Sequence, residues 1–122
     1  MKKPVKPKPV KKITKKKLAS MARTAKRKAL SAWSHAVRDR DGNACIICGS
    51  TKYNQAHHLL SKEYYKDLQF EIMNGVCVCA SCHKYSGLSF HKNGFFGVSW
   101  MAKNRPDQYK WVMEHLEQNL KN

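Results

Sequence analysis

Apolar residues recur with helical spacing in two parts of this 122-residue chain. Between positions 18 and 37 they return every three or four residues, which predicts one amphipathic helix. Thr14 can cap the start of that helix, and Gly42 is a natural stop. The same spacing returns at positions 109–120, shortly after Pro106, and predicts a C-terminal helix.

The middle of the chain has a different pattern. Short apolar segments at 55–60 and 75–78 predict two strands, and a polar and aromatic loop at 61–70 lies between them. A short helix is expected to begin at Ser81, because Gly87 weakens a longer one. Two strands with helices around them indicate a small α+β fold. Five aromatic residues are expected to complete its core: Trp33, Phe95, Phe96, Trp100 and Trp111.

The first 13 residues alternate lysine, proline and valine, and this composition predicts a disordered or extended arm. The mass of 14.1 kDa fits one small core beyond this arm. We therefore expect a disordered basic arm at 1–17 and a single domain at 18–122. Within the domain we expect a helix at 18–40, a central segment at 41–92 and a C-terminal helical segment at 93–122.

Basic residues outnumber acidic residues by 24 to 8, which gives a formal net charge of +16. Residues 1–30 contain 13 of the basic residues and no acidic one, whereas residues 31–122 are nearly balanced. Concentrated positive charge favours a polyanionic partner, and nucleic acid is the first candidate. No apolar stretch approaches the roughly 20 residues that cross a bilayer, so neither a membrane protein nor a secretory signal is expected.

Four of the five cysteines form two Cys-x-x-Cys pairs, Cys45 with Cys48 and Cys79 with Cys82. A disulfide framework is not expected in a chain without an export signal. Four thiolates with this spacing suit tetrahedral Zn²⁺ and predict a structural zinc site. Cys77 is expected to be a buried thiol, although on a strand it would face the same side as Cys79 and could compete as a ligand.

Four further polar residues lie between or beside these cysteine pairs: His57, His58, Asn74 and His83. Neighbouring residues on a strand point to opposite faces, so His57 and His58 can serve two different roles. His83 directly follows the last cysteine of the predicted zinc site, which fixes its backbone. A lone histidine is more often structural than functional, but four such residues on one metal scaffold indicate a site.

This combination of motifs resembles the HNH endonucleases, whose active site is the ββα-metal unit of the His-Me finger. The resemblance rests on the segments CIICG, AHHLL and NGVCVCASCHK, with His58, Asn74 and His83 at the three motif positions. In the zinc-containing branch of the family, two Cys-x-x-Cys pairs bracket the active site in the same way. The similarity covers about residues 40–92. The flanking segments are also similar to small phage-encoded HNH proteins, including recombination nucleases of the NinG type.

The resemblance implies a metal-dependent DNA endonuclease with a zinc-stabilised ββα-metal core and flanking helices. His58 would be the general base that takes a proton from water, because a neutral imidazole is available near pH 7. His57 and His83 would hold one divalent cation, and two protein ligands leave open positions that suit Mg²⁺ or Mn²⁺. Asn74 would hold the loop and orient His58 through its side-chain amide.

Two positions depart from the common family pattern. Many relatives have an acidic residue where this chain has His57, and colicin-type nucleases have His there. Colicin-type nucleases also have a further metal-binding His at the position of Gly87, which cannot bind metal. His91 follows His83 by eight residues, so an unbroken helix would place it about 12 Å further along the axis. A break at Gly87 could return His91 to the metal.

Basic residues near the N-terminus are expected to contact DNA phosphates. They are Lys11, Lys12, Lys15, Lys16, Lys17, Arg23, Lys26, Arg27 and Lys28. Lys62 and Lys84, beside the proposed site, could either contact phosphate or be solvated. The apolar stripe at 18–37 could pack on the central segment or mediate dimerisation, so a monomer and a homodimer are both open.

Two other functions fit part of the sequence. A non-catalytic zinc-binding DNA module would use the basic arm but has no need of His57, His58 and His83. A zinc-stabilised protein-interaction adaptor would explain neither the basic N-terminus nor the paired histidines. We therefore expect a cytoplasmic DNA endonuclease with weak sequence specificity, which would act in recombination or DNA processing in a bacterial host if it is phage-encoded.

Overall fold

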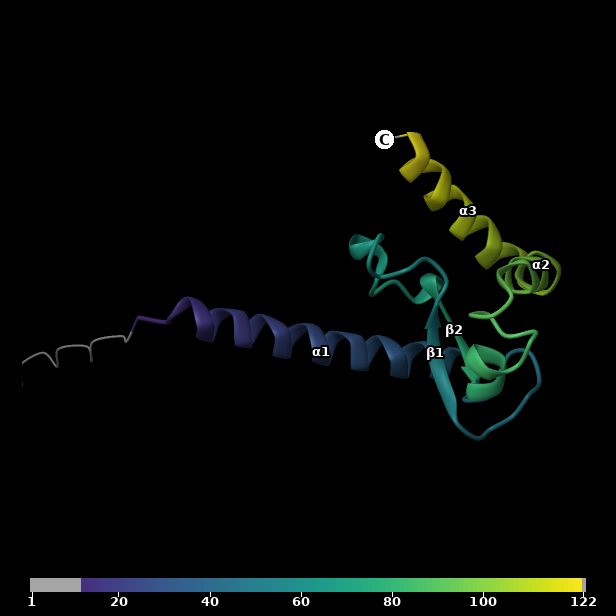
Figure 1. Cartoon of the computed structure of the whole chain (residues 1–122), viewed down its shortest axis with the longest axis horizontal. Helices are drawn as coiled ribbons and strands as arrows, with labels where there is room; N and C mark the ends of the chain where they lie inside the picture. Colours follow the sequence, from purple (N-terminus) through teal and green to yellow (C-terminus); the bar gives the residue numbers. More distant parts are fainter. Residues whose placement is uncertain (1–11, 122) are drawn as a thin grey trace, which may run out of the picture.

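The computed structural model describes residues 12–121. Residues 1–11, which include most of the predicted arm and Lys11, lie outside the described part. Figure 1 shows one long helix that extends as a rod from a compact remainder. The elements, in chain order, are α1 (Lys15–Arg40), β1 (Asn54–His58), η1 (Lys66–Leu68), η2 (Ile72–Asn74), β2 (Gly75–Cys79), η3 (Ser81–Tyr85), α2 (Gly94–Asn104) and α3 (Pro106–Lys121).

The long helix α1 begins at Lys15 and not at Leu18, so the predicted boundary of the arm is wrong. Thr14 caps the helix as the sequence predicts, because its Oγ1 accepts a hydrogen bond of 3.1 Å from the backbone N–H of Lys17. This bond satisfies one of the N–H groups that a helix start leaves unpaired. The three lysines at 15–17 therefore form the first turn of α1.

Only the C-terminal half of α1 packs against the rest of the molecule. Trp33 and Val37 are buried, whereas Leu18 and Met21 are about half exposed. Gly75 permits the close approach, since a Cβ atom there would lie 2.5 Å from Cζ2 of Trp33. Burying a large apolar side chain contributes about 1.5–3 kcal/mol, so the apolar stripe stabilises the fold at this end of α1.

The two predicted strands are confirmed. β1 and β2 form an antiparallel pair in which Asn54 lies opposite Cys79 and His58 lies opposite Gly75. Every residue of β2 is buried, so this strand forms the centre of the core. η3 follows β2 directly as a single π-helical segment. The described chain is therefore a small α+β fold, as the sequence predicts.

Asp41 connects three parts of the molecule at the end of α1. Its carboxylate accepts hydrogen bonds of 2.9 Å from Arg40, 2.8 Å from Arg105 and 2.9 Å from the backbone N–H of Cys77. The Asp41 side chain is 1% exposed. A buried carboxylate needs such partners because its desolvation is costly, so this ion pair fixes α1, β2 and the α2–α3 junction together.

Two helices complete the fold on the other side of the strands (Figure 1). The sequence predicts a helical segment here without separating α2 from α3. Asn93 caps α2, because its Oδ1 accepts a bond of 3.0 Å from the N–H of Phe96. The expectation that Phe95 completes the core is wrong: it is 92% exposed on α2, while its neighbour Phe96 is half-buried. No helix in residues 12–121 has the length and apolarity to cross a membrane.

Candidate metal centres

Four cysteines from three segments form the first candidate centre, which we call the cysteine cluster: Cys45, Cys48, Cys79 and Cys82. Their sulfur atoms all lie within 4.8 Å of one another, and those of Cys48 and Cys79 are 3.6 Å apart. Two sulfurs bound to one Zn²⁺ lie about 3.8 Å apart at tetrahedral angles. The cluster could therefore hold one metal ion such as zinc.

The first cysteine pair is shaped for this role by a tight turn. Gly49 has a φ of +77°, in the left-handed region that glycine adopts without strain. Its N–H donates to the carbonyl of Cys45 at 2.9 Å, and the N–H of Cys45 donates to the carbonyl of Ser50 at the same distance. The turn brings both sulfurs of the pair to the same side.

The pKa values of the thiols also indicate that the cysteine cluster suits a bound cation. Burial alone raises the pKa of Cys45, but backbone N–H groups, first that of Cys48, outweigh it and bring the pKa to about 7. Burial and the neighbouring cysteines raise the pKa of Cys82. Four thiolates at this distance repel one another, so a divalent cation is needed to hold all of them deprotonated.

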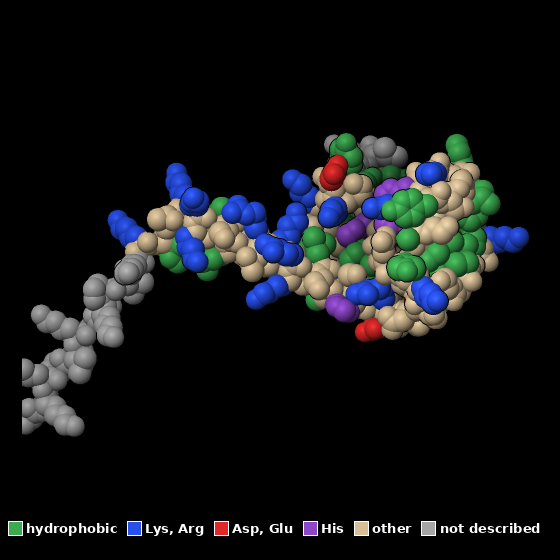
Figure 2. All heavy atoms as spheres, turned by 60° about the horizontal axis from the view of Figure 1, so that its bottom comes forward, with side chains coloured by type: hydrophobic (Ala, Val, Ile, Leu, Met, Phe, Trp, Pro, Cys, Tyr) green, Lys and Arg blue, Asp and Glu red, His purple; other side chains and the backbone are tan. Residues whose placement is uncertain are grey.

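Three histidines form a second centre, which we call the histidine cluster: His57, His83 and His91. One ring nitrogen of each lies within 4.8 Å of the others, and the Nε2 atoms of His83 and His91 are 2.9 Å apart. Nitrogens bound at about 2.1 Å to a common ion lie roughly 3.0–3.4 Å apart at octahedral to tetrahedral angles. Figure 2 shows that histidine side chains reach the surface of the compact part.

His91 joins this cluster because the chain turns back after η3. The π-helical segment ends at Tyr85, and the residues up to His91 form turns and bends. The N–H of His91 then donates to the carbonyl of His83 at 3.0 Å. The predicted break near Gly87 is therefore present, and His91 lies where a third ligand is needed.

Three ligands change the expectation about the metal. The sequence predicts two protein ligands, whereas the structure brings together three imidazoles and, within residues 12–121, no carboxylate. Imidazole nitrogens suit first-row transition ions such as Zn²⁺ and Ni²⁺, while Mg²⁺ prefers oxygen ligands. The donor set fits a transition ion better than the Mg²⁺ that two ligands suggested.

Two of the three residues in the histidine cluster, His57 and His83, are uncharged at neutral pH. Burial, followed by the positive charges of the neighbouring histidines and Lys84, lowers the pKa of His57 to about 3. Burial and the charges of His91 and Lys84 lower the pKa of His83 to about 4. Both rings are therefore neutral near pH 7, which is the form that binds metal.

His58 lies outside the histidine cluster, on the opposite side of β1 from His57. Its ring stacks on Trp33 with centroids 3.8 Å apart and an interplanar angle of 6°. Its Nε2–H donates to the backbone carbonyl of Gln69 at 2.9 Å. Since Nε2 holds the proton, Nδ1 retains its lone pair. Burial, together with the charge of Lys62, lowers the pKa of His58, although the bond to Gln69 opposes this.

Asn74 is fully buried and holds the loop between the strands. Its amide nitrogen donates to the carbonyls of Leu60 at 3.0 Å and Leu68 at 3.1 Å, and its Oδ1 accepts from the N–H of Leu60 at 2.7 Å. The prediction that the amide holds the loop is confirmed. The hydrogen bond that orients the His58 ring comes from the Gln69 carbonyl and not from Asn74.

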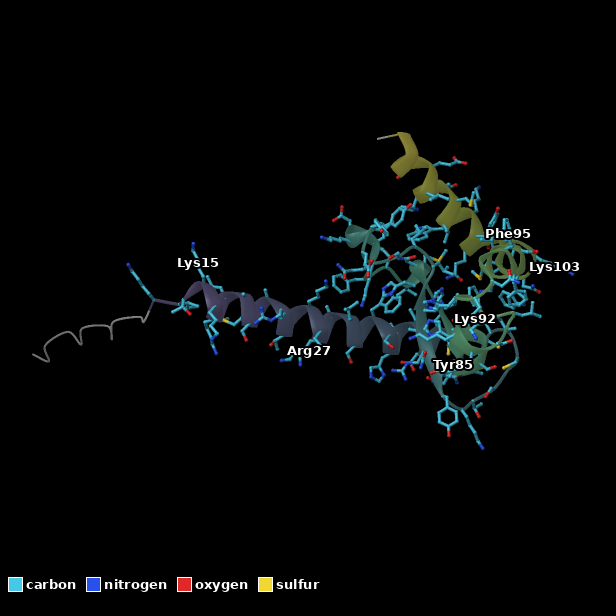
Figure 3. The ribbon with its side chains drawn as sticks, viewed as in Figure 1. Lys15, Arg27, Tyr85, Lys92, Phe95 and Lys103 are labelled. Atoms are coloured by element: carbon cyan, nitrogen blue, oxygen red, sulfur yellow. The ribbon has the colours of Figure 1, made fainter. Side chains whose placement is uncertain are left out.

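Basic side chains cover the exposed half of α1, and two further lysines lie beside the site. The predicted DNA-contacting residues of the described part are all exposed: Lys12, Lys15, Lys16, Lys17, Arg23, Lys26, Arg27 and Lys28. Figure 3 shows Lys15 and Arg27 on different sides of α1. Lys62 and Lys84 are exposed too, and each acts electrostatically on a histidine of the site.

One polar residue of the site was missed by sequence reasoning. Gln55 is two residues before His57 on β1, and its Oε1 lies 2.6 Å from Nδ1 of His83. Side chains alternate along a strand, so the sequence could have shown that Gln55 and His57 share one face. The contact of Gln55 with His83 on η3 could not be predicted from the sequence, because it depends on how β1 and η3 pack.

An apolar cavity of about 230 Å³, lined in part by His57, lies between the loop after β1 and helices α2 and α3. Leu60, Met101 and Met113 are among the side chains that line it. The cavity offers no cationic group for a phosphate.

Comparison of the chain with protein-family models, with curated proteins and with solved structures found no match.

Proposed function

We propose that this protein is a metal-dependent DNA endonuclease of the HNH type. The observation that carries the proposal is the histidine cluster, in which three imidazoles converge with no carboxylate among them and one of the three residues, His91, is exposed. Three protein ligands leave coordination positions open for water and phosphate oxygens, as catalytic metal sites require. The cysteine cluster, by contrast, provides the four ligands of a closed structural site.

The order of the elements supports this assignment. β1 carries His57 and His58, β2 follows Asn74, and η3 carries His83. Two antiparallel strands followed by a helical segment have the same order as the ββα-metal unit that the sequence resemblance implies. The cysteine cluster joins the end of β2 to η3 and so fixes His83 next to the strands.

In the proposed mechanism His58 is the general base. The Gln69 carbonyl holds the proton on Nε2, which leaves Nδ1 free to take a proton from the attacking water. The stack on Trp33 fixes the plane of the ring. A neutral His58 near pH 7 is consistent with its lowered pKa.

The bound cation would supply stabilisation of the negative charge that develops on the phosphate and the leaving oxygen. His57, His83 and His91 would hold it. Lys62 on the His58 side and Lys84 on the histidine-cluster side would bind the flanking phosphates. Lys12 and the exposed basic half of α1 add eight positive charges between positions 12 and 28 with no acidic residue, and these would bind the DNA backbone further away.

The proposal is tested by nicking of supercoiled plasmid, with zinc-loaded protein and separate additions of Mg²⁺, Mn²⁺, Ni²⁺ and Zn²⁺. We expect wild type to relax the plasmid with at least one of these ions. His58→Ala should reduce the rate by about 10²–10⁴, the usual contribution of acid–base catalysis. Thermal unfolding of the variant checks that loss of the Trp33 stack has not unfolded it.

The same assay separates the alternative function. A non-catalytic zinc-binding DNA module would bind the plasmid through α1 and leave it supercoiled with every ion. Equal rates for wild type and His58→Ala, in preparations purified in parallel, would indicate a contaminating nuclease and contradict the proposal.

A further inference from the structure

Gln55 makes a short hydrogen bond to the histidine cluster from outside it. Its side-chain Oε1 lies 2.6 Å from Nδ1 of His83. Gln55 is on β1 and His83 is on η3, so the bond joins two elements that each carry part of the cluster. Neither His57 nor His91 has such an outer partner among residues 12–121, where their ring contacts lie within the cluster and with Phe90.

The chemistry of this bond determines the tautomer of His83. An amide oxygen only accepts hydrogen bonds, so Nδ1 of His83 must be the donor and must hold the proton. An imidazole that binds a metal ion is neutral and has one proton, so a proton on Nδ1 leaves Nε2 with its lone pair. That lone pair faces Nε2 of His91, 2.9 Å away, at the centre of the cluster.

We infer that Gln55 is a positioning residue, which fixes the tautomer and the ring orientation of His83 so that Nε2 can bind the metal. This inference rests on the proposed function, because it assumes that the histidine cluster binds a divalent cation. Outer partners of this kind orient metal-binding histidines in many proteins, and their loss typically costs about 10–100-fold in metal affinity.

A merely structural role for the Gln55 side chain is not supported by its surroundings. Gln55 is exposed, and its bond to His83 is its one side-chain hydrogen bond within the described residues. Its pairing with Val78 across the strands uses the backbone. Removing the side chain should therefore leave the β1–β2 pair and the cysteine cluster in place.

The first test measures Ni²⁺ binding by calorimetry to the full-length protein with zinc already bound. Ni²⁺ suits imidazole ligands, and mass spectrometry after the titration confirms that zinc has stayed bound. We expect Gln55→Ala to bind Ni²⁺ about 10–100-fold more weakly than wild type. Gln55→Glu, which keeps an acceptor oxygen, should bind at least as tightly as wild type. Gln118→Ala removes an exposed amide from α3 and serves as the matched control, with no expected change.

The second test observes the tautomer directly, by the ¹⁵N chemical shifts of His83 in protein without Ni²⁺. Wild type and Gln55→Glu should have the proton on Nδ1, whereas Gln55→Ala should shift toward the tautomer with the proton on Nε2. A structural role would not produce this change. A His83 proton on Nε2 in wild type would overturn the inference.

The two proposals fail in different ways. If wild type binds no Ni²⁺ beyond its zinc, the metal site itself is wrong and the role of Gln55 falls with it. If wild type binds Ni²⁺ and Gln55→Ala binds it equally well, the metal site stands and only the role of Gln55 is overturned.

Discussion

The cysteine cluster and the histidine cluster share one element, η3, which carries Cys82 and His83, yet they differ in the coordination positions that they leave open. The cysteine cluster has four soft ligands from three segments, two of them buried. The histidine cluster has three imidazole ligands, and one of its residues, His91, is exposed. Four ligands close a tetrahedral site, whereas three leave room for a substrate. The comparison teaches that ligand number and exposure separate a site that holds the fold from a site that can perform chemistry.

The largest expected effect, on folding itself, comes from removing a ligand of the cysteine cluster. Cys48→Ser should release zinc and abolish most of the cooperative unfolding transition, because zinc binding contributes folding free energy in small domains. Circular dichroism melting and a zinc assay measure this. Cys77→Ser is the matched control and should keep its zinc, since Cys77 is buried on β2 and is not one of the four clustered cysteines. Full zinc content in well-folded Cys48→Ser would show that the wrong thiols were assigned.

Removing a ligand of the histidine cluster should weaken metal binding without unfolding the protein. His83→Ala removes one of three ligands, so its affinity for a transition ion should fall by more than the about 10–100-fold expected for an outer partner. Zinc content and melting temperature should stay close to those of wild type, because the four cysteines are intact. Calorimetry with Ni²⁺ and a melting curve on the same sample test both points. Unfolding of His83→Ala would mean that the two clusters are not independent.

Asp41 offers a way to weaken the fold without touching either cluster. Asp41→Asn should cost about 3 kcal/mol, because it leaves Arg40 and Arg105 without their shared buried carboxylate. Urea unfolding at neutral pH measures this loss. At neutral pH in the absence of urea, folded Asp41→Asn should bind zinc and Ni²⁺ as tightly as wild type does. Loss of Ni²⁺ binding with zinc retained would contradict this.

The same carboxylate gives a pH dependence with a definite sign. Burial alone raises the pKa of Asp41, but the bonds from Arg40, Arg105 and the Cys77 N–H outweigh it, so the pKa in the folded protein lies below the ordinary 3.8. The stabilisation is therefore complete above that value and is lost as the pH falls through the folded pKa. The difference in unfolding free energy between wild type and Asp41→Asn should shrink as the pH falls below 3.8 and through the lower pKa of folded Asp41. A difference that grows on acidification would have the wrong sign.

The smallest effect concerns α1, which belongs to neither cluster. Replacing Arg23, Lys26 and Arg27 with alanine should flatten the salt dependence of DNA affinity by about 0.9 in logarithmic slope for each phosphate that the variant no longer binds. Lys103→Ala on α2 (Figure 3) is the control for general charge. Fluorescence anisotropy at several salt concentrations measures the slopes. Identical slopes for wild type and the triple variant would show that this half of α1 does not contact DNA.

The cysteine cluster and the strands could be predicted from the sequence because their signals are local. The Cys-x-x-Cys spacing specifies a ligand pair within one turn, and alternation along β1 places His57 and His58 on opposite faces. The loop-holding role of Asn74 was implied by the family resemblance, in which Asn74 takes one of the three motif positions. For the cysteines and the strands the signal lies within a few residues of sequence, although the two cysteine pairs themselves meet across 31 positions.

The remaining features depend on where separate segments meet. His91 joins the histidine cluster only because the chain reverses after Tyr85, and the spacing of eight residues alone predicts a distance too long for a shared ion. Asp41 meets Arg105 across 64 positions of sequence. The position of Phe95 could not be predicted either, because two adjacent phenylalanines on α2 carry no signal for which one faces the core.

The most direct test of the nuclease assignment is the rate of plasmid cutting as a function of metal concentration, measured for wild type, His83→Ala and His58→Ala with zinc bound. The account predicts that rising metal concentration restores part of the activity of His83→Ala, because the weakened site fills again. It predicts no recovery for His58→Ala, since added metal cannot replace a missing base. Recovery of His58→Ala with metal, or full activity of both variants without it, would contradict the assignment of these roles.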